Sequence, residues 1–227
     1  MNKEIIKLEG VNIFQKDHCI FNNIYLSVKK GEFLYLIGET GEGKSSLLKA
    51  LYGDIEIESG NIEVTEKNLT KIKSVDIPEL RKKLGIVFQD FQLLTDRNIY
   101  ENLKFVLDST GWKQKKLINN RIQEVLEYVE LTGKENKMPY EISGGEQQRA
   151  AIARSLLNSP DIILADEPTG NLDPLKSDKI IQLLKKINKE GTTVVIATHD
   201  YQVIKNHPAR TIKCQTKGLH EIESHKL

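Results

Sequence analysis

The segment Gly38–Ser45, GETGEGKS, constrains the fold more than any other part of this 227-residue chain. It matches the pattern G-x-x-x-x-G-K-S/T and lies between a short apolar run, Phe33–Ile37, and a helical run that begins at Ser46. In that context the loop wraps backbone N–H groups and a helix N-terminus around phosphate oxygens, with Lys44 reaching the β- and γ-phosphates and Ser45 binding Mg²⁺. The alternative is a tight strand-to-helix turn with an exposed lysine, and the flanking strand and helix favour phosphate binding. The predicted nucleotide-binding residues in this segment are Gly38, Glu39, Thr40, Gly41, Glu42, Gly43, Lys44, Ser45 and Ser46.

Further apolar runs predict the fold class. Ile162–Ala165 and Thr193–Ala197 are short and continuous, which is typical of strands buried on both faces of a parallel sheet. Segments with helical periodicity separate the apolar runs, as in Ile118–Val129 and Ile180–Ile187. This alternation predicts an α/β protein with a doubly wound core and helices on both faces.

The chain departs from this alternation at two places. Residues 5–28 alternate in shorter β-like segments, which predicts a small antiparallel sheet at the N-terminus. Residues 98–158 have an almost purely helical pattern, which predicts a helical subdomain inserted into the core. We therefore expect one domain, residues 1–227, with a core of about 1–97 and 159–227.

Composition excludes some classes of function. Lys plus Arg (33) almost equals Asp plus Glu (32), so the net charge of +1 gives no reason to expect a nucleic-acid partner. No apolar stretch approaches 18 residues, and the first residues lack the apolar region of a signal peptide, so we expect the chain itself to stay in the cytosol. Cys19 and Cys214 lack metal-type spacing and are expected to be packing residues.

Two adjacent carboxylates, Asp166 and Glu167, follow the apolar run Ile162–Ala165. Strand ends of this kind lie at the rim of the sheet where the phosphate loop is expected. There Asp166 would hold the Mg²⁺ shell and Glu167 would polarise an attacking water. Without Lys44, two acids at a strand end would be interpreted as solvent-facing or as a helix cap.

The run Ser143–Arg149, SGGEQQR, comes before a helical pattern. Ser143 and Glu146 fit the capping box S-x-x-E, and paired glycines at a helix start also form a backbone anion site. The two interpretations are compatible, because the cap builds the anion site.

Gln89 and His199 each follow an apolar run, Gly85–Phe88 and Val194–Thr198. Either residue alone would be an ordinary polar strand end. We expect the two strands to be adjacent, so that both side chains point at the γ-phosphate, where a donor stabilises developing charge. The remaining histidines have no partner spacing and are expected to be solvated; they are His18, His207, His220 and His225.

The order of these motifs resembles the ATP-binding cassette (ABC) ATPases over essentially the whole chain. The resemblance implies ATP and Mg²⁺ as cofactors, with Gln89, Glu167 and His199 in catalysis. It implies Mg²⁺ ligands at Ser45, Gln89 and Asp166, an adenine-stacking aromatic at Phe14 and a conserved loop containing Asp173. It also implies that the segment corresponding to the family signature contacts the ATP held by another copy; this segment consists of Ser143, Gly144, Gly145, Glu146 and Gln147. Ile142 and Glu146 differ from the commonest signature, L-S-G-G-Q, and Phe14 replaces the usual Tyr, without putting activity in doubt.

Within the family, Phe88–Asn102, and in particular Asp96-Arg97 after two leucines, looks most like the FtsE cell-division branch. That resemblance implies a homodimer that sandwiches ATP, an FtsX-like membrane partner, and a peripheral location on the cytoplasmic face of the plasma membrane. It also implies a role in regulating peptidoglycan hydrolysis during division. The main alternative is the ATPase of a lipoprotein-release or exporter-type transporter. A soluble cassette acting on ribosomes or DNA and a catalytically inactive regulator remain further alternatives.

Overall fold

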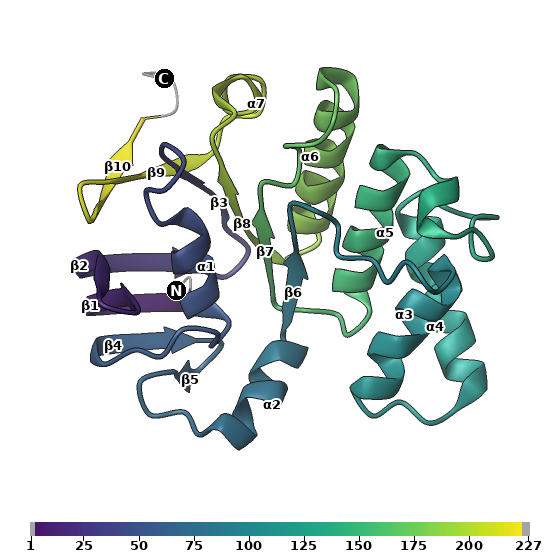
Figure 1. Cartoon of the computed structure of the whole chain (residues 1–227), viewed down its shortest axis with the longest axis horizontal. Coiled ribbons are helices and arrows are strands. Elements are labelled where there is room, and N and C mark those ends of the chain that lie inside the picture. The colour runs from purple at the N-terminus through teal and green to yellow at the C-terminus, as the bar shows by residue number, and fades with distance from the viewer. Residues whose placement is uncertain (1–2, 224–227) are drawn as a thin grey trace.

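The computed structural model describes residues 3–223, which form two sheets and the helices around them (Figure 1). An antiparallel sheet has the order β2-β1-β4-β5. Its strands are β1 (Glu4–Gln15), β2 (His18–Lys29), β4 (Ser59–Val64) and β5 (Lys67–Asn68). Gly10 has a φ of +61° and lies where the register between β1 and β2 shifts. Before the shift the buried residues of β1 are at even positions, Ile6 and Leu8, and after it they are at odd positions, Val11 and Ile13. The predicted N-terminal antiparallel sheet is confirmed.

The second sheet has the order β10-β9-β3-β8-β7-β6. Its strands are β3 (Phe33–Ile37), β6 (Leu84–Val87), β7 (Ile162–Asp166), β8 (Thr193–Thr198), β9 (Arg210–Gln215) and β10 (Gly218–Ile222). All neighbours pair in parallel except β9 and β10. The predicted core strands are confirmed, but β6 and β8 are not adjacent, because β7 lies between them. Gln89 and His199 therefore follow strands on either side of the strand that carries Asp166.

Helices cover both faces of this sheet. They are α1 (Lys44–Leu51), α2 (Ile77–Lys82), α3 (Ile99–Ser109), α4 (Lys115–Tyr128), α5 (Gly144–Leu156), α6 (Pro174–Lys189) and α7 (Tyr201–Asn206), with short 3₁₀ turns at Ser74–Asp76 and Pro139–Glu141. Alternate residues of β3 belong to two hydrophobic clusters, one on each face of the sheet. Leu34 and Leu36 pack with α1 and the antiparallel sheet, whereas Tyr35 and Ile37 pack with the helices of the opposite face. The sheet is thus apolar on both faces, as its continuous hydrophobic strands predict.

The segment between β6 and β7 contains α3, α4 and α5, which form the lobe on the right of Figure 1. No strand occurs in residues 98–158, as the sequence pattern predicts. Asn98 caps α3 by accepting a hydrogen bond from the Glu101 N–H, 2.8 Å away. The exact limits of the helical subdomain remain a prediction.

The expectation that all remaining histidines are solvated is wrong for His207. Its side chain is only 14% exposed, and Nε2 lies 2.6 Å from Oδ1 of Asp178 on α6. The packing of α7 against α6 creates this pair, which residue spacing does not reveal. His18 and His220 are exposed, and His225 lies outside the described residues. Within residues 3–223, no helix combines the length and apolar character required to span a bilayer.

Candidate nucleotide-binding and hydrolysis site

The loop Gly38–Gly43 joins β3 to α1, and α1 begins at Lys44. Gly43 has a φ of +89°, and Phe21 of β2 lies 2.8 Å from where its Cβ would be, so only glycine fits there. The Lys44 side chain is 7% exposed, and its ammonium donates hydrogen bonds to the carbonyls of Gly38 (2.8 Å) and Glu39 (3.1 Å). The lysine is therefore buried, satisfied by the loop and turned back over it.

Glu167 connects the loop to the end of β8. It follows β7 directly, has a φ of +45°, and donates its backbone N–H to the Ala197 carbonyl at 2.8 Å. A left-handed conformation is unfavourable for a residue with a Cβ and is found where surrounding structure enforces it. The carboxylate is largely buried: Oε1 lies 3.9 Å from Lys44 Nζ and 2.7 Å from His199 Nδ1, while the His199 N–H donates to Oε2 at 3.4 Å. The fold thus brings together three predicted site residues that are up to 155 positions apart.

Asp166 is the last residue of β7 and lies within hydrogen-bonding distance of Ser45, next to the phosphate loop. Burial raises the pKa of its carboxyl group, and a hydrogen bond from Ser45 opposes that rise. Ser45, Gln89 and Asp166 line one cavity of about 470 Å³. A hydroxyl, an amide oxygen and a desolvated carboxylate are the hard oxygen donors that Mg²⁺ prefers, so these residues fit the predicted metal site.

The segment after β6 is held from two sides. Asn171 Nδ2 donates to the Gln89 carbonyl at 3.0 Å. On the other side, the guanidinium of Arg154 from α5 donates to the carbonyls of Phe91, at 2.9 Å, and Gln92. Phe91 and Gln92 both have positive φ, at 59° and 48°, so Arg154 binds a turn that is itself unfavourable.

Arg154 and Asn171 were not among the predicted site residues. Burial lowers the pKa of Arg154, whose charge lies between α5 and the turn. A signal for Arg154 was present in the sequence, because it is spaced by three positions from the buried Ala151 and Leu157. A charged residue on the apolar face of a helix indicates a buried polar partner. No comparable signal existed for Asn171.

The signature segment begins α5. Ser143 is the N-cap, and the predicted capping box with Glu146 is present. The Ser143 N–H and hydroxyl both donate to Glu146 Oε2 at 2.8 Å, and Lys134 Nζ lies 3.0 Å from Glu146 Oε1. These hydrogen bonds, chiefly the one from the Ser143 backbone, lower the pKa of Glu146 to about 2, so the carboxyl group is ionised at neutral pH.

The remaining predicted residues lie around these groups. Gln147 Nε2 donates to the Ile142 carbonyl at 3.2 Å. Asp173 caps α6, accepting the Lys176 N–H at 3.1 Å and pairing with its ammonium at 2.7 Å. Phe14 is half-buried on β1 opposite Cys19 of β2, the strand that also touches Gly43. This arrangement places the aromatic ring on the hairpin beside the phosphate loop.

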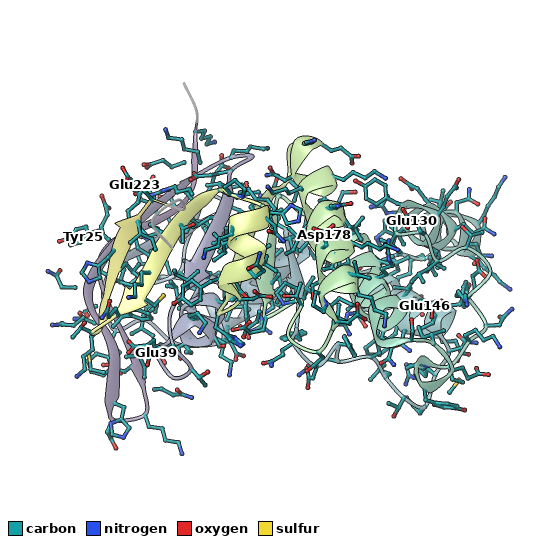
Figure 2. All side chains as sticks on the ribbon, turned by 90° about the horizontal axis from the view of Figure 1, so that it is seen from above. Tyr25, Glu39, Glu130, Glu146, Asp178 and Glu223 are labelled. Carbon is teal, nitrogen blue, oxygen red and sulfur yellow. The ribbon has the colours of Figure 1, made fainter. Side chains whose placement is uncertain are left out.

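The phosphate loop and the signature segment lie far apart in one chain. Figure 2 shows Glu39 of the loop and Glu146 of the signature in separate halves of the molecule, with Asp178 of α6 between them. In Figure 1, strands β8, β7 and β6 separate α1 from α5. One copy of the chain therefore cannot place both segments on the same nucleotide.

Comparisons with known proteins identify the family of this chain. A family profile described as "ABC transporter" matches residues 21–170. The chain is 44% identical over 201 residues to the cell division ATP-binding protein FtsE of Streptococcus pneumoniae serotype 2 (strain D39 / NCTC 7466), covering 88% of this chain and 87% of that protein. It is 45% identical over 192 residues to FtsE of Mycobacterium tuberculosis (strain ATCC 25618 / H37Rv), covering 85% and 83%.

Among solved structures, the chain resembles the dimeric structure of a post-hydrolysis state of the ATP-binding cassette MJ0796 bound to ADP and Pi. The TM-score is 0.85 at 33% identity, covering 96% of this chain and 98% of that chain. The predicted fold, an ABC nucleotide-binding domain, is thus confirmed. The chain belongs to the ABC transporter family and is an ATPase of that family.

Proposed function

We propose that this protein is the ATP-hydrolysing subunit of an FtsEX-like complex and that two copies close around two ATP molecules. The observation that carries the proposal is the separation of the phosphate loop from the signature segment within one chain. In a two-fold dimer, Lys44 and Ser45 of one copy would face Ser143 to Gly145 of the other across a shared nucleotide. Two-fold dimers are the commonest closed symmetry for identical subunits.

In each site, Lys44 would exchange its two loop carbonyls for the β- and γ-phosphates, and Phe14 would stack on adenine. Ser45, Gln89 and Asp166 would hold Mg²⁺, which when bound neutralises charge on the phosphate oxygens. Glu167 would orient a water toward the γ-phosphate and accept its proton. His199, through Nδ1, would hold the Glu167 carboxylate in that orientation.

The same site supports a mechanical cycle. ATP stabilises the closed dimer because it binds the closed form more tightly than the open form, and only by that difference in affinity. Hydrolysis removes the difference, so the dimer can open again. The turn Gln89–Gln92 would transmit the change, because it lines the 470 Å³ cavity and is fastened to the signature helix by Arg154. Gln89 lines this cavity, Leu93 packs against the core, and the Phe91 ring lies 3.9 Å from where a Gly144 Cβ would be.

Similarity to FtsE supports a role in cell division, and we infer that the partner is an FtsX-like membrane protein. The ATPase would then lie on the cytoplasmic face of the plasma membrane, and its cycle would regulate peptidoglycan hydrolases outside the cell. A lipoprotein-release or exporter-type partner would instead indicate transport.

The sandwich is tested with Glu167→Gln, which keeps the shape of the side chain but removes its basicity. Light scattering should show a dimer with ATP and Mg²⁺ and a monomer with ADP, because binding is retained while hydrolysis stops. Lys44→Ala in the same background should remain monomeric. A Glu167→Gln protein that binds ATP yet stays monomeric at micromolar concentration would reject the sandwich.

The partner is tested separately by affinity purification of tagged Glu167→Gln protein from detergent-solubilised native membranes with ATP and Mg²⁺. Mass spectrometry should identify a membrane protein with a large external domain and a link to division. Recovery of a lipoprotein-release or exporter permease would replace the division role with transport and leave the ATP sandwich intact.

A further inference from the structure

The signature segment carries a negative charge at the place where a partner's γ-phosphate is proposed to bind. Glu146 is ionised at neutral pH, and one of its oxygens holds both the N–H and the hydroxyl of Ser143, at 2.8 Å each. The single proton of the Ser143 hydroxyl therefore points at Glu146. To donate to a phosphate, the hydroxyl must turn away from that carboxylate.

Lys134 is placed to compensate for this change. It lies in the turn after α4, nine positions before Ser143, and its ammonium is 3.0 Å from the second carboxylate oxygen of Glu146. Within residues 3–223, Lys134 is the one cation that forms an ion pair with Glu146. Lys176 lies across Gly145, with its Cδ 3.1 Å from where a Cβ would be, but its ammonium is paired with Asp173 at 2.7 Å.

We propose that Lys134 is a positioning residue for the contact between Ser143 and the partner's ATP, acting by neutralising Glu146 when the Ser143 hydroxyl turns to the γ-phosphate. The inference rests on the proposed sandwich. Without Lys134, closing the dimer would bring a phosphate toward an unpaired carboxylate, and like charges repel strongly when water is excluded between them. With Lys134 present, the Glu146 carboxylate keeps its ion pair with Lys134 and its hydrogen bond from the Ser143 N–H while the Ser143 hydroxyl turns to the γ-phosphate.

The alternative is that the Lys134–Glu146 pair only ties the turn to α5. The two roles differ in what happens when Glu146 is neutral. If Lys134 compensates charge, Glu146→Gln makes it dispensable for closure. If the Lys134–Glu146 pair only holds the turn in place, Glu146→Gln breaks that pair just as Lys134→Ala does, so Glu146→Gln by itself weakens closure to a similar extent.

The test measures ATP-dependent dimerisation by analytical ultracentrifugation in the Glu167→Gln background. Lys134→Ala should weaken the dimer by roughly three- to tenfold, because each dimer contains two copies of a partly exposed ion pair. Lys134→Arg should restore it. Glu146→Gln alone should dimerise at least as well as the parent, and its combination with Lys134→Ala should dimerise as well as Glu146→Gln alone. Binding of a fluorescent ATP analogue to the monomer should be unchanged in all of them.

Lys137→Ala is the matched control, since it removes a nearby lysine that pairs with Glu141 at 3.7 Å and leaves Glu146 untouched. Its dimer should match the Glu167→Gln parent. The inference is overturned by an unchanged dimer in Lys134→Ala, by a loss in Glu146→Gln alone as large as that in Lys134→Ala, or by the same effect of Lys134→Ala with and without Glu146→Gln. Failure of the Glu167→Gln parent to dimerise would reject the sandwich itself, so the two failures are distinguishable.

Discussion

The Nδ1 atom of His199 lies 2.7 Å from Oε1 of Glu167, and the two residues follow neighbouring strands, β8 and β7. The backbone N–H of His199 also points at the other Glu167 oxygen, so one residue contacts both oxygens of the carboxylate. Because Glu167 is largely buried and has a left-handed backbone conformation, its orientation depends on these contacts. A positioning role for His199 follows from this geometry.

His199→Ala is expected to lower the rate of ATP hydrolysis by roughly 10- to 100-fold, because the carboxylate loses its contact with Nδ1 at 2.7 Å. The affinity for ATP should change little, since the side chain contacts Glu167 and neither Lys44 nor Ser45. Steady-state ATPase assays and equilibrium nucleotide binding check this. His220→Ala, on the exposed strand β10, is the control and should keep full activity. A His199→Ala protein with normal turnover would contradict the role.

Asp166→Asn is expected to stabilise the fold at neutral pH while abolishing ATPase activity. Burial raises the pKa of Asp166 in the folded protein. A carboxyl group with a raised pKa contributes stability below its unfolded pKa, and that contribution is lost as pH rises through the folded pKa. Ionisation of Asp166 in the folded protein therefore lowers stability, and Asn removes the charge.

Thermal unfolding across pH 4 to 8 tests the Asp166 prediction, since the gain in melting temperature should shrink as pH falls toward the acid end. Asp161→Asn, just before β7 and paired with Lys30 at 3.5 Å, is the control and should not raise the melting temperature at pH 7. A lower melting temperature for Asp166→Asn at pH 7 would show that the Ser45 hydrogen bond outweighs the burial of charge.

The sequence predicted the strands and helices that carry the candidate site, because the short apolar runs and helical periodicities are unambiguous in this chain. The capping box at Ser143 was predicted for the same local reason and is confirmed by its hydrogen bonds. Local patterns did not give the strand order. They placed the strands before Gln89 and His199 side by side, whereas β7 separates them.

Residue spacing also did not predict the polar contacts between residues that are distant in the sequence. His207 pairs with Asp178, and Arg154 holds the turn at Phe91, because packing brings distant elements together. A polar residue's partner depends on which helix lies against it, and a single sequence does not encode that locally. The roles of the site residues in turnover remain predictions, and the variants described here test them.

Ser143 is expected to have two separable roles. As the N-cap of α5, Ser143 accepts a hydrogen bond from the Glu146 N–H. Ser143→Ala should therefore lower the free energy of unfolding by about 1 kcal/mol. Ser143→Gly should lower it by only about 0.3 kcal/mol, because Gly is nearly as good a cap. Both changes remove the hydroxyl proposed to contact the partner's ATP, so both should weaken the ATP-dependent dimer in the Glu167→Gln background. Thermal unfolding and ultracentrifugation measure the two effects. If Ser143→Gly dimerises normally, the hydroxyl makes no contact across the interface.

Arg154 is expected to set the conformation of the turn that follows Gln89. Arg154→Ala would leave the carbonyls of Phe91, which is partly buried, and Gln92, which is exposed, without this donor, at a cost of about 1 to 3 kcal/mol. Arg121 provides the matched control, because its guanidinium donates to the carbonyls of Leu156 and Leu157 near the end of the same helix. Both variants should lower the melting temperature.

Only Arg154→Ala should release the segment that contains Gln89. Hydrogen exchange of amides 88–97 should become faster in Arg154→Ala and stay unchanged in Arg121→Ala. The Mg²⁺ concentration required for half-maximal ATPase activity should also rise only in Arg154→Ala, because Gln89 is proposed to bind the metal and would no longer be held in place. If amides 88–97 exchange at the same rate in the two variants, Arg154 contributes to packing but does not hold this segment in place. A selective effect would mean that the signature helix, through one guanidinium, fixes the turn that is proposed to transmit the ATP cycle.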